Sequence, residues 1–527
     1  MRTDDAKQLI KRAHRARDRR APWNSILSDA FRYAGPELDS GFQQLNTSPG
    51  QQRPDRQVYD STAYQAAKDA ADQVRMILTP PNTRFLEVRA APDSETQELT
   101  DLLDEAADKF FQHLNASDFQ AVVGAAYHQA QITAGCLQVA EATEGAVSAF
   151  EIASVPLAEI YPEQALDPAR QTIWRIRRLP VSLIEEQWPN IDIPPRLAER
   201  RRAGADEAVE IIEGAVWQRE KGSFRYVVLW PDDEGHLLFE QEQNTSPWIY
   251  GGYGRTPGEV LSRGPVLAVL PDIRTLDKAV ELLLKNASIA VVGIWQADDD
   301  GVINPSTVRL VPGTIIPKAV GSAGLQPLRM PGNFDVSQLV ISELRARIRY
   351  AIMRREMPNL AKSHVTTNAI DREALEVELL RVPGLLVLWR ELVVPLFRRC
   401  LDILARRGEV FGGIDARIGR DIHVVPVSPW MKMQEMAQIN DEAQAISLAA
   451  AVSPGTVSAV IDLPAWQADV IRRLGVPDRF IRQPDDIAES LQAQAQAEAV
   501  ERTAEAAGRA APALRALGGQ PPRGGGK

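Results

Sequence analysis

The stretch IRTLDKAVELLLKNASIAVVGIW, residues 273–295, is apolar around most of the circumference of a helix. Asp277, Glu281 and Lys285 are four positions apart and mark one narrow polar stripe, and most other positions are apolar. A helix with so little polar surface must be covered on several sides. We therefore expect a helix over residues 271–296 that packs against more than one neighbour.

A second helix is predicted shortly after the first. Residues 335–356 place Leu344, Ile348 and Ile352 on one stripe of a helix. Between the two helices, residues 297–334 are rich in Gly and Pro and contain short β runs. This order predicts two helices joined by a small β-containing insertion.

A polar loop is expected after the second helix. Residues 357–367 precede Asn368, which is a suitable N-cap for the next helix. The loop's candidate contact residues are Asn359, Lys362, Ser363, His364, Thr366 and Thr367. A catalytic role for the His is not favoured, because the local sequence supplies only Ser363 and hydroxyls that are better explained as helix caps.

The helical pattern over residues 368–427 contains residues that interrupt a helix. Pro383, Gly384 and Pro395 weaken or remove backbone hydrogen bonds, so we expect a kinked helix.

The rest of the chain predicts an α+β fold. Residues 1–33 have the pattern of one basic amphipathic helix, whose Lys and Arg side chains form either a solvated face or a patch for nucleic acid or membrane. From about residue 136 to 270 the pattern changes to short β runs, from CLQVAEAT to GPVLAVL, with the turn signal PDDEG between two of them. Residues 428–518 are helical in pattern, and residues 519–527, GQPPRGGGK, are expected to be disordered.

Length and composition limit the class of protein. The 527 residues allow two to four domains, and 44% apolar with 25% charged residues is ordinary for a globular chain. The net charge of −10 argues against tight, electrostatic binding of duplex DNA. Cys136 and Cys400 are far apart and suggest neither a disulfide framework nor a zinc cluster. The sequence contains no signal peptide and no apolar run long enough to span a membrane.

No motif of a familiar enzyme is present in the sequence. GxxxxGK[ST], HExxH and GxSxG do not occur, and the glycine-rich GGYGRTPG, residues 251–258, is interpreted as a turn. The six His residues are scattered, and the acidic DDD at 298–300 is interpreted as an exposed turn. We therefore predict no catalytic, cofactor-binding or metal-binding residues.

Several stretches in a fixed order resemble the portal proteins, the head-to-tail connectors of short-tailed bacteriophages. They are PWNSILSDAFRYAGPE (22–37), VYDSTAYQAAKDAADQVRMILTPPNTRFLEV (58–88), TTNAIDREALEVELLRVPGLLVLWRELVVPLFRRCLDILARRG (366–408), VVPVSPWMKMQEMAQINDEAQAI (424–446) and DLPAWQADVIRRLGVPDRFIR (462–482). Each motif alone is weak, but their order is specific, and the resemblance runs from about residue 12 to 485.

The resemblance implies a division of the subunit into named parts. These are a wing (1–270), a first stem helix (271–296), a clip (297–334), a second stem helix (335–356), a channel loop (357–367), a long kinked helix returning to the wing (368–427), a helical crown (428–518) and a tail (519–527).

The resemblance also implies a function and partners. The chain is expected to form a homo-oligomeric ring of twelve subunits at one capsid vertex of the virion, after assembly in the host cytoplasm. Genomic double-stranded DNA would pass through the channel without sequence specificity during packaging and ejection. The implied protein partners are the terminase large subunit, a tail adaptor, and capsid and scaffold proteins, with no cofactor, no membrane and no enzymatic activity.

Two alternatives from other classes remain open at this point. A DNA-processing enzyme of the packaging machinery would need acidic metal ligands that converge only in the fold, and assays for ATPase and nuclease activity with Mg²⁺ would reveal it. A peripheral membrane scaffold would use the basic N-terminal helix, and liposome flotation would detect its binding.

Overall fold

The computed structural model combines helices with antiparallel sheets, which confirms the α+β class. It describes residues 2–38, 58–91, 96–189, 191, 193–202, 208–292, 295–296, 326–327, 334–353, 383–411, 422–427, 429–452 and 460–473. The chain forms two compact units, Met1–Pro426 and Val427–Lys527.

The N-terminal pattern forms two helices rather than the one that the sequence predicts. Helix α1 spans Arg2–Arg20, a 3-10 turn spans Ala21–Trp23, and helix α2 spans Asn24–Ala34. Pro22 lies in the 3-10 turn, where its missing N–H removes a helical hydrogen bond and separates the two helices.

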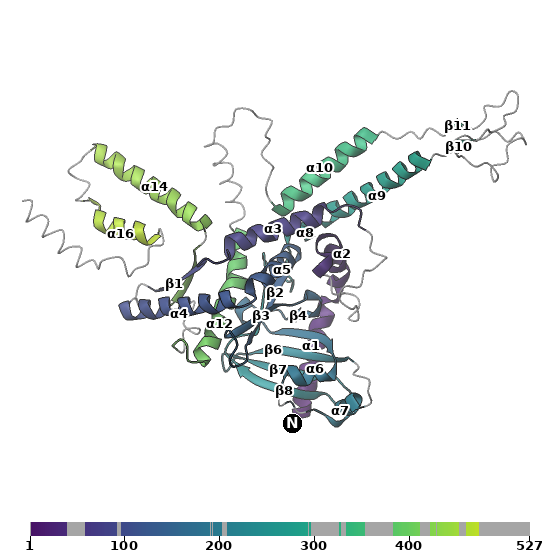
Figure 1. Ribbon diagram of the computed structural model, residues 1–527, viewed down its shortest axis with the longest axis horizontal. Coiled ribbons are helices and arrows are strands. Elements are labelled where there is room, and N and C mark those ends of the chain that lie inside the picture. The colour runs from purple at the N-terminus through teal and green to yellow at the C-terminus, as the bar shows by residue number, and fades with distance from the viewer. Residues whose placement is uncertain are drawn as a thin grey trace, which may run out of the picture. The chain divides into compact units, whose positions relative to one another are not determined.

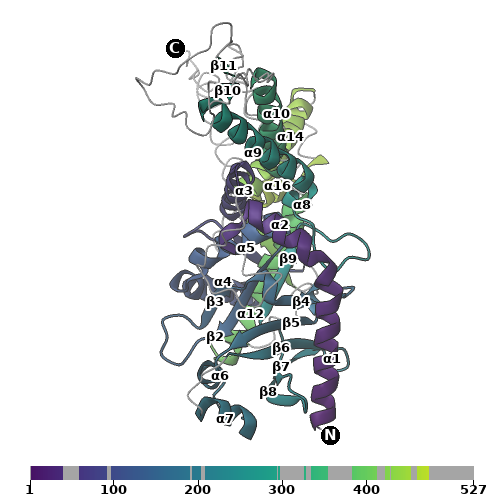
Figure 2. The same ribbon diagram turned by 90° about the vertical axis from the view of Figure 1, so that its right-hand side faces the viewer.

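A five-stranded antiparallel sheet forms one end of the first unit. Its order is β4 (Ile160–Pro162), β5 (Ile173–Leu179), β6 (Val209–Gln218), β7 (Ser223–Trp230) and β8 (His236–Gln243). Helix α1 crosses this sheet (Figure 2) and buries Leu9 and Ala13 against it. Ile212 faces α1 while its neighbour Ile211 belongs to the core on the other side, so both faces of the sheet are covered.

A three-stranded sheet, β3-β2-β9, lies between that sheet and a group of helices. Its strands are β2 (Ala134–Glu141), β3 (Phe150–Ser154) and β9 (Trp248–Gly252), and the helices α4 (Gln97–Ala116) and α5 (Phe119–Ile132) precede β2. β6 and β9 were not predicted from the sequence. The last predicted β run, GPVLAVL, is instead the short helix α8 (Pro265–Ala268) followed by the start of α9, because Pro265 at its first turn favours a helix start.

The two predicted helices on either side of the insertion are present. They are α9 (Leu270–Val292) and α10 (Phe334–Met353), which run side by side away from the sheets (Figure 1). The first ends at Val292, earlier than the sequence predicts, and Trp295–Gln296 form β10, which pairs antiparallel with β11 (Gln326–Pro327). Most of the predicted insertion lies outside the described residues.

The helical region after Pro383 is irregular. A helical stretch from Pro383 leads into a π-helical turn, Trp389–Val393, and then into α12 (Val394–Arg406). Farther along, β12 (Ile422–Pro426) pairs antiparallel with β1 (Leu86–Ala90), which follows helix α3 (Thr62–Leu78).

The second unit is helical in its described part. It contains α14 (Pro429–Val452) and α16 (Leu463–Arg473), joined by a hydrogen bond of 2.9 Å from the Trp466 indole N–H to the Glu442 carboxylate. The predicted disordered tail lies outside the described residues.

Candidate functional site

The helix pair α9–α10 is attached to the body of the first unit by a network of charged groups. Arg345 on α10 donates two hydrogen bonds, of 2.9 and 2.7 Å, to the carboxylate of Asp60 just before α3. The other oxygen of that carboxylate accepts the Thr62 backbone N–H at 2.9 Å. On α9, the Asp277 carboxylate accepts the backbone N–H groups of Tyr59 and Asp60 at 2.6 and 3.2 Å.

This network fixes the protonation state of Asp60. Burial alone would raise the pKa of the carboxyl group, but the hydrogen bonds from Thr62 and Arg345 outweigh it and the pKa is lowered. The group is therefore an anion at neutral pH, and it binds α3 and α10 together. Asp277 lies inward in the same network, so the polar stripe of α9 serves attachment as well as solvation.

The outer surface of the helix pair is unusually apolar. Five large apolar side chains on α9 and α10 are exposed by between 47% and 69%: Leu282, Leu284, Leu339, Val340 and Tyr350. Leu282 and Leu284 are two positions apart and so lie on nearly opposite sides of α9, which leaves apolar side chains for more than one partner to cover. The sequence predicts that α9 is covered on several sides, and the first unit leaves Leu282 and Leu284 uncovered, so the prediction of further cover stays a prediction.

The predicted contact residues of the polar loop lie outside the described residues. They are Asn359, Lys362, Ser363, His364, Thr366 and Thr367, and their role stays a prediction.

The described residues that flank this segment lie close together. Ala351 and Ile352 near the end of α10 line the same cavity, of about 490 Å³, as Pro383 and Gly384, where the description of the chain resumes. The chain therefore leaves the body and returns to it at one place.

Two of the predicted kink residues, Pro383 and Gly384, lie at the start of the helical region, and the third, Pro395, lies farther along it. Gly384 lies against Tyr253, where a Cβ atom would approach the ring to 2.9 Å, so the helix contacts the body closely there. Pro395 lies in the first turn of α12, directly after the π-helical turn. In that turn the Val394 N–H bonds to the Trp389 carbonyl, five residues back. The sequence predicts a disturbance here but not its π-helical form.

The glycine-rich GGYGRTPG is not a simple turn. Its first two residues end β9, and Gly251 lies so close to the π-helical turn that a Cβ atom would come within 2.5 Å of the Glu391 Cβ atom. The Glu391 carboxylate accepts the Gly252 N–H at 3.1 Å. These glycines are needed for the close approach of a strand to a helix, which sequence reasoning missed.

Several titratable side chains of the described residues have structural roles. The His113 ring accepts the Ala149 N–H at its Nδ1, so Nε2 carries the proton that is shared with Glu409 at 2.7 Å. Cys136 and Cys400 are buried thiols, and burial raises the pKa of both, that of Cys136 to about 12. Within the described residues, no group of three His, Cys, Asp or Glu side chains is arranged to hold a metal ion. In the same residues, no helix is both long and apolar enough to cross a membrane.

The exposed apolar side chains of α9 and α10 define a protein that is suited to binding another chain. Residues 6–481 match the family described as "Bacteriophage head to tail connecting protein". The chain belongs to this family, and it is a portal-type protein that connects the head and the tail of a bacteriophage. The short-tailed type remains a prediction.

Two solved structures are similar to this chain. One is titled "Virion of native gene transfer agent (GTA) particle", with 13% sequence identity, 74% of this chain and 86% of that chain covered, and a TM-score of 0.32. The other is titled "Neck of empty GTA particle computed with C6 symmetry", with 13% identity, 79% and 90% coverage, and a TM-score of 0.33. No curated protein sequence matches the chain.

Proposed function

We propose that this head-to-tail connector acts as a closed ring of twelve copies through which double-stranded DNA enters and leaves the capsid. The observation that supports the ring most directly is the apolar outer surface of α9 and α10, which a single chain leaves exposed. A closed ring covers such a surface on every copy, since each subunit meets two neighbours.

The parts of the subunit follow from this proposal. The pair α9–α10 is the stem, 297–334 the clip, and 357–367 the channel loop. The wing consists of 1–270 and part of 368–427, and the crown is 428–518. The clip docks the terminase large subunit during packaging and a tail adaptor afterwards, and the ring is incorporated among capsid and scaffold proteins.

The net charge of the ring favours the passage of DNA through it over tight binding of DNA. Each chain carries −10, so twelve copies carry about −120, which repels a polyanion and disfavours tight binding. Lys362 and His364 contact DNA phosphates at the loop without reacting with them. The function is therefore mechanical, and the ring has no catalytic role.

The stem is tested by charge introduced on its apolar surface. Leu284→Glu and Leu339→Glu should leave the fold intact, because both side chains are exposed, and should prevent ring formation in negative-stain images and analytical ultracentrifugation. Met76→Glu, at a comparably exposed apolar residue on α3, is the control and should form rings. Rings formed normally by both stem variants would contradict the proposal.

The loop is tested in a DNA packaging assay. Lys362→Glu combined with His364→Glu adds twenty-four carboxylates to a ring of twelve, close enough to the phosphates that a Debye length of about 8 Å does not screen them. We expect rings to form but packaging to fall. Normal packaging by this variant would remove the loop from the DNA path.

A further inference from the structure

A half-enclosed cleft of about 470 Å³ lies on the first unit, away from the stem. It is bounded by the segment before β5, by the β8–β9 connection, and by the π-helical turn with the start of α12. Its inner wall is aromatic, since Trp217 and Phe224 meet edge to face with ring centres 5.0 Å apart. The attachment of the stem and the close approach of β9 to the π-helical turn assign no role to this cleft.

The rim of the cleft has a surplus of positive charge. Arg170, Arg390 and Arg398 line it, against the carboxylates of Asp167 and Glu391. Both carboxylates are engaged with the backbone: Asp167 accepts the Ala169 N–H at 3.0 Å, and Glu391 accepts the Gly252 N–H at 3.1 Å. Asp167 is also paired with Arg170 at 3.4 Å, so the exposed Arg390 is the cation that an approaching acid meets.

The cleft is rigid on the side of the β8–β9 connection. The buried carboxylate of Asp402 accepts hydrogen bonds from Asn244 and Thr245, each of 3.0 Å. The buried Arg399 donates to the Thr245 carbonyl at 3.2 Å. A wall held in this way presents the same shape to every partner, so it loses little conformational entropy on binding.

The tip of the β2–β3 hairpin has the complementary character. Its turn, Thr143–Ala146, is closed by a hydrogen bond of 3.2 Å from the Ala146 N–H to the Thr143 carbonyl, and Gly145 has φ of +87°, as a type II turn requires. Glu144 is exposed beside it, and Val147 is 85% exposed. The tip thus presents an acid and an apolar side chain on a fixed turn.

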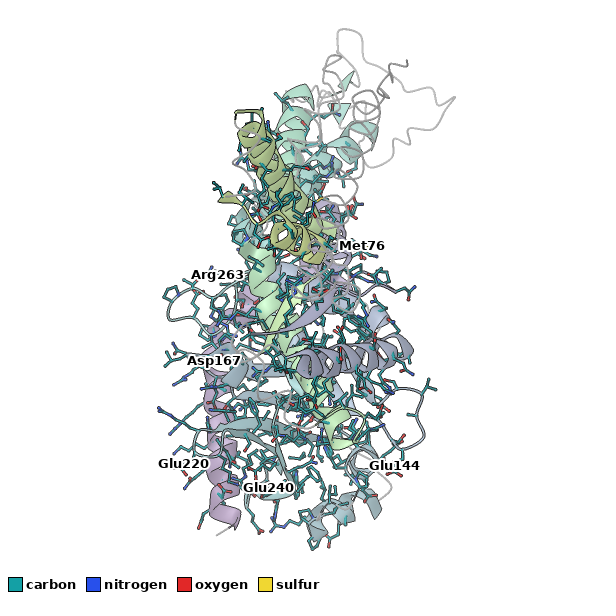
Figure 3. All side chains as sticks on the ribbon, turned by 90° about the vertical axis from the view of Figure 1, so that its left-hand side faces the viewer. Met76, Glu144, Asp167, Glu220, Glu240 and Arg263 are labelled. Carbon is teal, nitrogen blue, oxygen red and sulfur yellow. The ribbon has the colours of Figure 1, made fainter. Side chains whose placement is uncertain are left out.

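The cleft and the tip lie on different sides of the first unit. Figure 3 labels Asp167, on the rim of the cleft, at one edge and Glu144 at the opposite edge. A ring of identical subunits is built from a heterologous contact, in which one surface meets a different surface of the next copy. The tip and the cleft lie at opposite edges of the first unit (Figure 3). The tip carries an acid and the cleft exposes an arginine, and both have apolar groups, so the two surfaces meet this requirement.

We propose that the β2–β3 tip of each copy docks into the arginine cleft of the next copy, with Glu144 facing Arg390 and Val147 covering the aromatic wall. This contact rests on the proposed ring and adds to the stem a second, charge-selective interface. It selects direction around the ring, because a tip cannot dock against another tip.

The experiment uses charge reversal on the full-length protein. Arg390→Glu gives two acids that face each other across the contact, and Glu144→Arg gives two cations. Each should raise the protein concentration for half assembly by roughly tenfold or more, since like charges across an interface oppose association. The double variant Arg390→Glu/Glu144→Arg restores opposite charges and should recover assembly.

Mixing the two single variants provides a sharper test. The Arg390→Glu variant keeps the acidic Glu144 on its tip, which fits the unchanged Arg390 cleft of the Glu144→Arg variant. The basic tip of the Glu144→Arg variant in turn fits the acidic cleft of the Arg390→Glu variant, so every contact is favourable only when the variants alternate. Native mass spectrometry should therefore find rings with equal numbers of the two variants from a mixture whose components do not assemble alone. Arg19→Glu and Asp233→Arg, at exposed positions outside both surfaces, are the controls and should assemble as the wild type.

The outcomes separate this contact from the ring itself. If the wild type forms no ring, the proposed function fails. If the wild type assembles and both single variants assemble equally well, or the double variant and the mixture do not recover, the tip and cleft are not partners. If Arg390→Glu rings form normally but are not incorporated into heads, the cleft receives an acidic segment of another protein and the proposal is wrong.

Discussion

Removal of the Asp60 charge should loosen the stem from the body. In Asp60→Asn the side chain still accepts the Thr62 N–H, but Arg345 loses the anion that it contacts at 2.9 and 2.7 Å. Hydrogen bonds to charged groups contribute roughly 1.5–3 kcal/mol when buried. Because the Arg345 side chain is 43% exposed, solvent screening reduces this. We expect a loss of about 1–2 kcal/mol in unfolding free energy.

A double-mutant cycle with Arg345→Met isolates the interaction. Denaturant unfolding at one fixed protein concentration gives the free energies, and hydrogen exchange of the α10 amides reports local opening of the stem. The coupling energy should be about 1 kcal/mol at neutral pH. The pKa of Asp60 is lowered from an ordinary value of 3.8, so this contribution is complete above that pH and disappears as the pH falls through the lower folded value. Additive single substitutions at neutral pH would refute the role of this pair as the attachment of the stem.

Three further perturbations follow from the structure. Arg177→Met should cost roughly 3–5 kcal/mol because it leaves the fully buried Glu213 without its ion pair of 2.7 Å, whereas the exposed neighbour Arg178→Met should change the unfolding free energy by less than about 0.5 kcal/mol. Gly251→Ala should cost about 1–3 kcal/mol through overpacking against the π-helical turn, and a melting temperature equal to that of the wild type would argue against the close contact. Burial lowers the pKa of His128, so stability should be complete above pH 6.5 and fall as the pH drops below it; His128→Gln should flatten this dependence in denaturation at pH about 7.5 and 5.5.

The elements that were predicted correctly are those with a local signal. Apolar positions that recur with helical spacing suffice to predict α9 and α10, and the PDDEG turn lies where expected, between β7 and β8. Strand β6 was missed because Glu213 and Gly214 interrupt its apolar run. Both interruptions have distant causes: Arg177 and Tyr226 bind the Glu213 carboxylate, and the Trp174 ring occupies the space where a side chain on residue 214 would lie.

The attachment of the stem could not be predicted from the sequence for the same reason. Asp60 and Arg345 are 285 positions apart, and no periodicity connects them. The role of both residues depends on their contact in the fold. No local pattern in a single sequence indicates that contact.

The π-helical turn connects the proposed contact between subunits with the segment that leads to the loop. Arg390 lines the cleft, and its neighbour Glu391 binds β9 through the Gly252 N–H. The same helical stretch begins at Pro383, whose side chain lines the cavity shared with the end of α10. A neighbouring tip in the cleft would therefore contact the helical stretch whose first residues lie beside the end of α10. Single π-helical turns inside helices are frequent at functional sites, which agrees with a contact at this position. If the ring closes through the cleft, then one short helical stretch, residues 383–393, carries both the contact with the neighbour and the contact with the end of α10, so the attachment of the stem and the assembly of the ring depend on the same residues.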